Sequence, residues 1–251
     1  IPGAVPLMQN TDGLEMMIPI KYKDTFQSIC KQWEKTTQLE LEQDEYQKMI
    51  VPDVNNYISI YTDKEVTREE WLKYQKESPE NLYKRKDGKF YMAKTKCKGR
   101  FEFKDKALHK NKSYSVISKA LYDFFVHGIK PEDYLKSNKN IFDYCGYVKA
   151  KGQWGFKSMF IDADREAKEQ LLQKTLRYVI TKKGCKIIKY NKVDGRTQQV
   201  EAGIWMQTLL NLYQNEDFDS FDIDYKYYLS NINREIKSLD PNLLVTQYNL
   251  F

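Results

Sequence analysis

The sequence predicts an α+β protein, because strand patterns with turn residues fill its first part and helical patterns dominate from Ala107 onward. Short apolar runs flank the polar corner at residues 10–13, which is typical of a β-hairpin. Residues 113–128 place apolar side chains on one helical face, with Ser113 as the expected cap and Gly128 as the expected end. The chain of 251 residues can form one large domain or two small ones.

The same patterns predict the remaining elements of the first part. We expect a helix over residues 21–38 and strands at 39–42, 46–51 and 54–61. Residues 62–96 are rich in charge, and we interpret them as an insertion with a helix at 68–76 and a hairpin at 84–91.

In the second part, helices are expected at 131–137, 141–145, 166–173, 205–213 and 225–239. Strands are expected at 147–150, 154–161, 176–181, 185–190 and 197–201, the last three forming a small basic sheet.

Composition indicates a folded protein with a heavily charged surface, since 41% of residues are hydrophobic and 30% are charged. The net charge of +6 permits nucleic-acid binding without requiring it. The four cysteines show no metal-ligand spacing, and no apolar run approaches the ~20 residues of a membrane span. With no secretion leader either, we expect a cytoplasmic protein with reduced thiols.

Asp12 is the candidate metal ligand. A carboxylate at the tip of a hairpin is a rigid oxygen ligand that suits Mg²⁺ bridging to phosphate. The alternative is that Asp12 only serves the turn, as Asn, Asp and Gly often do.

The context of Asp12 resembles the third catalytic motif of family B DNA polymerases, in a phage-type version written Asn10-Thr11-Asp12-Gly13. The resemblance covers nearly the whole chain. It continues through residues 53–58, 98–103, 108–113, 119–121 and 176–180. Two departures stand out: Asn10 replaces the first aspartate, and Asn55-Asn56-Tyr57 stands where many members have two lysines before a tyrosine.

The resemblance implies an architecture. Residues 1–106 would be the C-terminal half of a ferredoxin-like palm, with the charged insertion at 62–96. Residues 107–246 would be a mostly helical thumb with a small β-hairpin sheet, and 247–251 a tail.

The resemblance also implies an activity, DNA-directed DNA synthesis with two Mg²⁺ ions, of which Asp12 would bind one. The second carboxylate, the fingers and the exonuclease would come from an N-terminal polymerase portion, so this chain alone should be inactive. We therefore expect a C-terminal fragment, a processed product or one piece of a split enzyme, which if phage-encoded acts in a bacterial cell. Its partners would be primer–template DNA, deoxynucleotide triphosphates and that N-terminal portion.

Basic residues supply the candidate DNA contacts. Alternate residues of a strand share a face, so Lys94, Lys96, Lys98 and Arg100 could line one side and neutralise phosphates. The alternative is a solvated edge strand guarded by lysines. The predicted DNA-binding residues are Asn55, Asn56, Tyr57, Lys96, Lys98, Arg100, Lys110, Lys112, Arg177, Lys182 and Lys183.

The last five residues resemble a peptide that docks into a sliding clamp, with Gln247, Leu250 and Phe251 as its anchors. The alternative is a tail packed on its own thumb. A second hypothesis for the whole chain is a non-catalytic module that binds DNA or tethers a clamp, for which Asp12 is dispensable.

Overall fold

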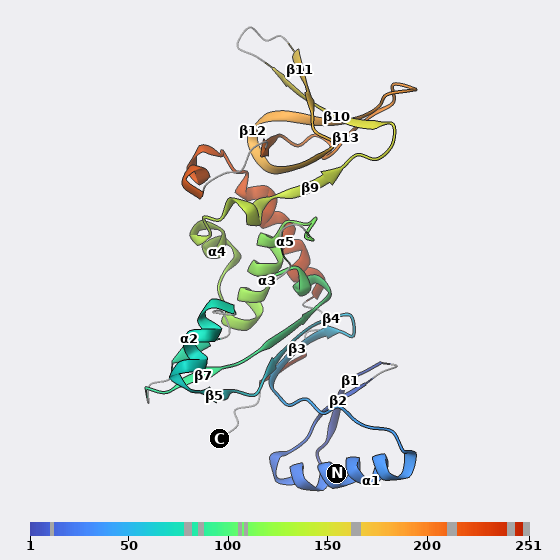
Figure 1. Ribbon diagram of the computed structural model, residues 1–251, viewed down its shortest axis with the longest axis vertical. Helices are drawn as coiled ribbons and strands as arrows, with labels where there is room; N and C mark the ends of the chain where they lie inside the picture. Colours follow the sequence, from blue (N-terminus) through green and yellow to red (C-terminus); the bar gives the residue numbers. More distant parts are fainter. Residues whose placement is uncertain are drawn as a thin grey trace. The chain divides into compact units, whose positions relative to one another are not determined.

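The computed structural model describes residues 1–10, 13–77, 82–84, 88–104, 107, 110–161, 167–209, 215–239 and 244–247. It confirms the α+β class, with helices and antiparallel strands in both parts of the chain (Figure 1). The chain forms two compact units. Unit 1 comprises Ile1–Arg100 and Leu239–Phe251, and unit 2 comprises Phe101–Ser238. The sequence predicts the first boundary at residue 106, and the structure has it at residue 100. The sequence also assigns residues 239–246 to the second part, whereas they belong to unit 1.

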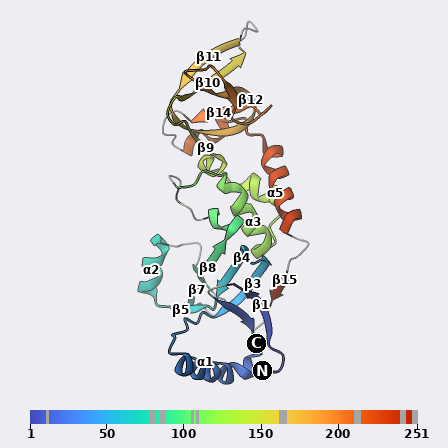
Figure 2. The same ribbon diagram turned by 90° about the vertical axis from the view of Figure 1, so that its right-hand side faces the viewer.

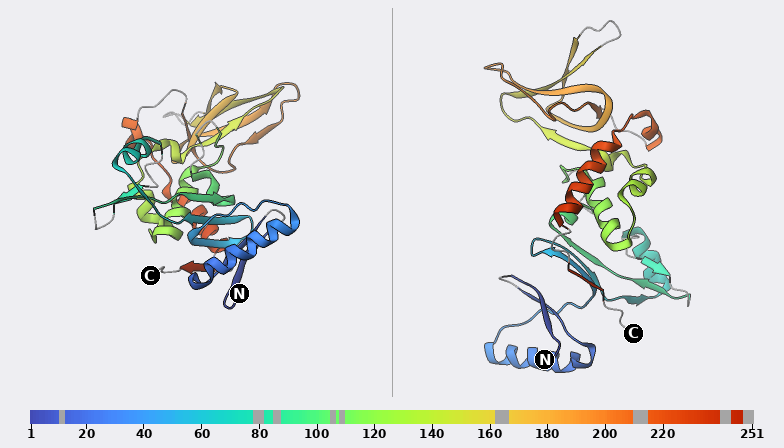
Figure 3. Two further views of the ribbon diagram at one scale, coloured as in Figure 1. Left: turned by 60° about the horizontal axis from the view of Figure 1, so that its bottom comes forward. Right: turned by 180° about the vertical axis from the view of Figure 1, so that it is seen from behind.

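Unit 1 begins with the predicted hairpin, formed by β1 (Val5–Gln9) and β2 (Leu14–Met17). The helix α1 (Lys23–Thr37) follows, and it ends where Gln38 adopts a left-handed conformation with φ of 59°. In Figure 3, α1 lies beside the hairpin. Residues 39–42 form no strand, contrary to the prediction, and Leu39 and Leu41 are exposed.

The hairpin packs on an antiparallel sheet with the strand order β15-β3-β4-β8. These strands are β3 (Tyr46–Asp53), β4 (Asn56–Tyr61), β8 (Thr95–Lys98) and β15 (Leu244–Gln247). Met8 of the hairpin joins Met49, Val51 and Tyr57 of the sheet in one buried cluster. Burial of these apolar side chains is what holds hairpin and sheet together.

The charged insertion folds as predicted around one helix, α2 (Arg68–Glu77). Its strands β5 (Lys64–Val66), β6 (Leu82–Lys84) and β7 (Phe90–Met92) form a separate three-stranded sheet. Trp71 of α2 packs on Phe90 of β7, with ring centroids 4.6 Å apart.

Unit 2 contains the predicted helices α3 (Ser115–His127), α4 (Pro131–Ser137) and α5 (Tyr225–Leu239) and a 3-10 turn at Ile141–Tyr144. Gly128 ends α3 with φ of 70°, as expected, but the N-cap is Tyr114 rather than Ser113. Tyr228 of α5 accepts a hydrogen bond from the Ile180 amide (2.9 Å) and donates one to the Tyr144 carbonyl (2.7 Å). This buried hydroxyl ties α5 to the sheet and to the 3-10 turn.

The sheet of unit 2 has six strands, more than the small hairpin sheet predicted. They are β9 (Gly146–Lys149), β10 (Trp154–Ile161), β11 (Ala167–Leu172), β12 (Thr175–Asn191), β13 (Thr197–Gln199) and β14 (Met206–Leu209). The long strand β12 pairs with β9 and β14 through its first half and with β10 and β13 through its second (Figure 2). Near its middle, a Cβ on Gly184 would overlap the Met206 carbonyl oxygen. Only glycine fits there.

Two predicted helices of unit 2 are strands. Residues 166–173 were predicted helical, but Ala167–Leu172 pairs in register with β10 as β11. Residues 205–213 were also predicted helical, but Met206–Leu209 pairs with β12 as β14. Lys, Glu, Gln and Leu are good helix formers, so tertiary pairing with neighbouring strands overrides local propensity in both segments.

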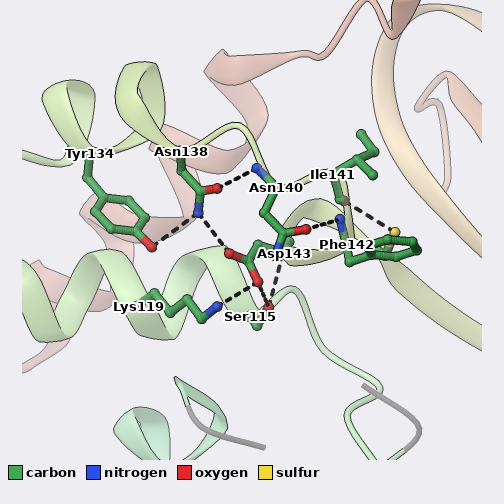
Figure 4. Close-up of polar contacts among 9 residues, drawn as sticks. Ser115, Lys119, Tyr134, Asn138, Asn140, Ile141, Phe142 and Asp143 are labelled. Carbon is green, nitrogen blue, oxygen red and sulfur yellow. Dashed lines mark hydrogen bonds and ion pairs between the residues drawn. The ribbon is translucent and has the colours of Figure 1, made fainter. Parts of the chain in front are cut away.

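A buried carboxylate connects α3, α4 and the 3-10 turn. Asp143 accepts hydrogen bonds from Ser115 Oγ (3.0 Å), Lys119 Nζ (2.7 Å) and Asn138 Nδ2 (2.9 Å), as Figure 4 shows. The Asp143 side chain is only 10% exposed and that of Lys119 is 30% exposed. Three donors compensate the charge that burial would otherwise leave unsolvated.

Asp143→Ala should therefore lower the free energy of unfolding by about 2–4 kcal/mol, because it removes the carboxylate that pairs with Lys119 and accepts from Ser115 and Asn138. Urea denaturation followed by circular dichroism measures this change. The control is Asp219→Ala, which removes a 91% exposed carboxylate 3.7 Å from Lys139 and should change little. Similar losses for the two variants would contradict a structural role for the Asp143 network.

Candidate nucleic-acid interface

The hairpin of unit 1 closes through Asn10 and Gly13. The Asn10 amide donates to the Gly13 carbonyl (3.0 Å), and the Gly13 amide donates to Asn10 Oδ1 (2.8 Å). The Asn10 side chain thus serves the turn. Asp12, the predicted Mg²⁺ ligand, lies outside the described residues.

Within the described residues, no three His, Cys, Asp or Glu side chains are grouped to hold a metal ion. The nearest described carboxylate along the hairpin is Glu15, which pairs with Met8 across the strands. Paired residues share a face, so Glu15 lies on the face that carries the buried Met8.

Glu15 lies in a half-buried polar setting. Burial raises the pKa of Glu15, with Lys96 opposing that rise and Asp44 adding to it. Tyr46 and Tyr61 both donate to Asp44 Oδ2, at 3.2 and 3.1 Å. The region between hairpin and sheet thus holds two carboxylates close to one lysine.

Asn56 connects two segments that are far apart in the sequence. Its side-chain Nδ2 donates to Asp53 Oδ2 (2.9 Å), and its Oδ1 accepts from the Arg100 backbone amide (3.0 Å). Gly99 has φ of +62°, and a Cβ there would overlap the Asn55 carbonyl oxygen and Asn56 Oδ1. We name this contact between residues 53–56 and 99–100 the Asn56–Gly99 junction. It brings together the Asn-Asn-Tyr and Lys-Gly-Arg segments.

The predicted DNA contacts around the junction differ in how exposed their side chains are. Asn55 and Lys98 are exposed, so both remain candidates. Asn56 is half-buried and its amide is used in the junction. Tyr57 is 8% exposed and belongs to the core cluster, so its side chain is not available to DNA, contrary to the prediction.

The predicted row of basic residues on β8 is shorter than expected. Lys96 lies opposite Ser59 and Lys98 opposite Tyr57, so the two lysines share one face of the sheet. The strand ends at Lys98, and Gly99 begins a 3-10 turn. Arg100 is exposed on that turn, and Lys94 precedes the strand, so neither continues the alternation.

In unit 2, a basic pocket contains one predicted residue. The pocket of about 370 Å³ is lined by side chains of β9, β10, β12 and β13 and by Lys112. Three further lysines line it, Lys149, Lys151 and Lys189, and we name these four the pocket lysines. Sequence reasoning did not select Lys149 and Lys151, although their spacing of two at the end of a predicted strand could have indicated a shared side.

The other predicted contacts of unit 2 do not line this pocket. Arg177 donates to the Asn111 carbonyl (3.2 Å) and lies over the Tyr147 ring, and burial lowers its pKa. Lys182 forms an ion pair with Asp222 at 3.1 Å. Lys110 and Lys183 are exposed. Arg177 therefore has a structural contact rather than an open surface position.

The predicted clamp-binding tail begins within a strand. Gln247 is the last residue of β15 and pairs with Lys48 of β3. Leu250 and Phe251 lie outside the described residues.

Comparisons with protein-family models, with curated proteins and with solved structures find no match to this chain. Across the described ranges, the helices lack the combination of length and apolarity that crossing a membrane requires.

Gly99→Ala should destabilise the protein by about 2–5 kcal/mol, because the new methyl group meets backbone and amide oxygens at a positive φ. Thermal and urea denaturation of the purified chain measure the loss. Gly88→Ala is the matched control, since Gly88 has φ of +86° but open space around its Cβ position. Equal losses from the two substitutions would show that the junction adds nothing beyond backbone strain.

Glu15→Gln should stabilise the protein at neutral pH, because burial of the charged carboxylate is unfavourable. A pKa raised in the folded state means that the contribution of Glu15 to stability is present below its unfolded value of 4.5 and is lost as pH rises through the folded value. The gain from the substitution should therefore shrink on acidification. Melting temperatures across that range, with the exposed Glu42→Gln as control, measure it; a gain independent of pH would contradict this account.

Proposed function

We propose that this chain is the end of the palm and the thumb of a DNA polymerase that resembles family B. In this proposal it grips primer–template DNA and supplies Asp12 to a two-Mg²⁺ site completed by an N-terminal polymerase portion. The Asn56–Gly99 junction is the observation that carries the proposal. It joins two segments that are far apart in the sequence and that each resemble a primer–template motif of the family. Asn55 and Lys98 are exposed beside it.

The hairpin supports the same proposal. Hydrogen bonds between Asn10 and Gly13 leave a two-residue connection that includes Asp12, as the polymerase motif requires.

The exposed face of α1 is suited to the N-terminal portion as a partner. Ile29 is 50% exposed and Trp33 42% exposed, and Ile20 just before the helix is 65% exposed. Within unit 1, the described side chains leave these apolar residues uncovered. A polypeptide that completes the palm would bury them. For such an enzyme we propose action in the cytoplasm of a bacterial host.

The test is primer extension by the chain combined with a polypeptide that carries the fingers and the first palm motif. Asp12→Asn should reduce extension by about a hundredfold or more, because the lost metal ligand supplies several kcal/mol of transition-state stabilisation. Lys98→Ala should weaken primer–template binding, and this loss should shrink as salt rises, because the variant makes one phosphate contact fewer and has a smaller salt dependence. Asp24→Asn, an exposed substitution on α1, should leave both activities unchanged.

A second candidate, a non-catalytic module that binds DNA or tethers a sliding clamp, is favoured by the cluster of pocket lysines in unit 2. It predicts DNA binding by the chain alone and full function of Asp12→Asn. Equal primer extension by wild type and Asp12→Asn would discard the metal role, and absence of extension with intact DNA binding would favour the second candidate.

A further inference from the structure

The basic pocket of unit 2 is lined by side chains of two kinds. Four of them are apolar or aromatic: Phe156, which is 2% exposed, and the half-buried Tyr147, Val148 and Val200. The rest of the lining consists of the four pocket lysines and two glutamines, Gln198 and Gln199. Of the described residues that line the pocket, none is an aspartate or glutamate.

The strand register explains this arrangement. Phe156 of β10 lies opposite Lys189 of β12, and Lys189 lies opposite Gln198 of β13. Because paired residues share a face, Phe156, Lys189 and Gln198 stand in a row across three strands, and the Lys189 ammonium lies 4.8 Å from the centre of the neighbouring Trp154 ring. Lys112, Lys149 and Lys151 add cations from outside this row.

Within the described part of the chain, acidic side chains do not neutralise the pocket lysines. Among the described side chains, no ion pair joins Lys112, Lys149, Lys151 or Lys189 to a carboxylate. Other lysines of unit 2 do have such partners, as Lys157 has with Glu169 at 2.7 Å. Four like charges that converge on one pocket repel one another unless an anion binds between them.

We infer that this pocket binds an unpaired nucleotide of a single-stranded nucleic acid. The lysines would hold the phosphates that flank the nucleotide, and the base would lie against Tyr147 and the apolar lining residues. Gln198 can donate to and accept from a base edge, whereas the Gln199 side-chain oxygen already accepts a hydrogen bond from the Gly203 amide (2.9 Å). A duplex fits less well, since its bases are stacked and paired and cannot enter a pocket.

This inference concerns unit 2 alone and does not depend on the metal role of Asp12 or on the Asn56–Gly99 junction. It therefore goes beyond the proposed grip on primer–template DNA.

The test is fluorescence anisotropy of the full chain with a labelled oligothymidylate, with the matching duplex, with thymidine triphosphate as competitor and with inorganic phosphate. Single-strand binding should be salt-dependent. The double variant Lys149→Ala/Lys151→Ala should weaken it by about tenfold or more, with a smaller effect on the duplex. The control is Lys130→Ala/Lys136→Ala, which removes the same charge from exposed positions around α4.

A second pair of variants leaves size unchanged. Gln198→Glu places a negative charge in the pocket lining and should weaken single-strand binding. Gln173→Glu, at an exposed position outside the pocket, should not. Competition by the triphosphate but not by phosphate would support recognition of a nucleotide with its base. Equal losses for single strand and duplex, or unchanged single-strand binding in both pocket variants, would overturn the inference.

Discussion

The close approach of the β3–β4 turn to Gly99 is the constraint on which the surface of unit 1 depends. No side chain fits between Gly99 and the oxygens of Asn55 and Asn56, so the Lys98–Arg100 backbone lies directly on the turn. The buried cluster of Met8, Met49, Val51 and Tyr57 then holds the hairpin against the same sheet. A glycine contact, an amide and an apolar core therefore determine which polar groups are exposed.

In unit 2, one bent strand takes the corresponding role. β12 pairs with two neighbours along each half, and its register against β14 shifts between Ile180 and Cys185. Gly184 lies at this shift and allows the Met206 carbonyl to approach. Both β9 and β13 contribute to the pocket, although each pairs with a different half of β12.

Much of the fold could be predicted from local patterns, and the failures have a common cause. The hairpin at residues 10–13, the helix at 68–76 and the end of α3 at Gly128 follow from turn and helix signals that act within a few residues. The strands β11 and β14 have helix-forming compositions and exist only because distant strands pair with them. No local pattern contains that information.

The candidate binding residues, like the fold, could be predicted only in part, and the reason is the pairing of charges. Sequence can identify lysines, but it does not show which of them a carboxylate neutralises. Lys182 and Lys119 are paired, with Asp222 and Asp143, whereas the pocket lysines have no such partner among the described residues. The overall charge of +6 therefore says little about where an anion binds.

Some residues have a type that suits nucleic acid but are not available to it. The sequence predicts Tyr57 and Arg177 as DNA contacts, but Tyr57 packs in the core of unit 1 and Arg177 donates to a backbone carbonyl. Anions bind to cations that the fold brings together and does not pair with carboxylates. Strand register identifies these cations, and composition does not.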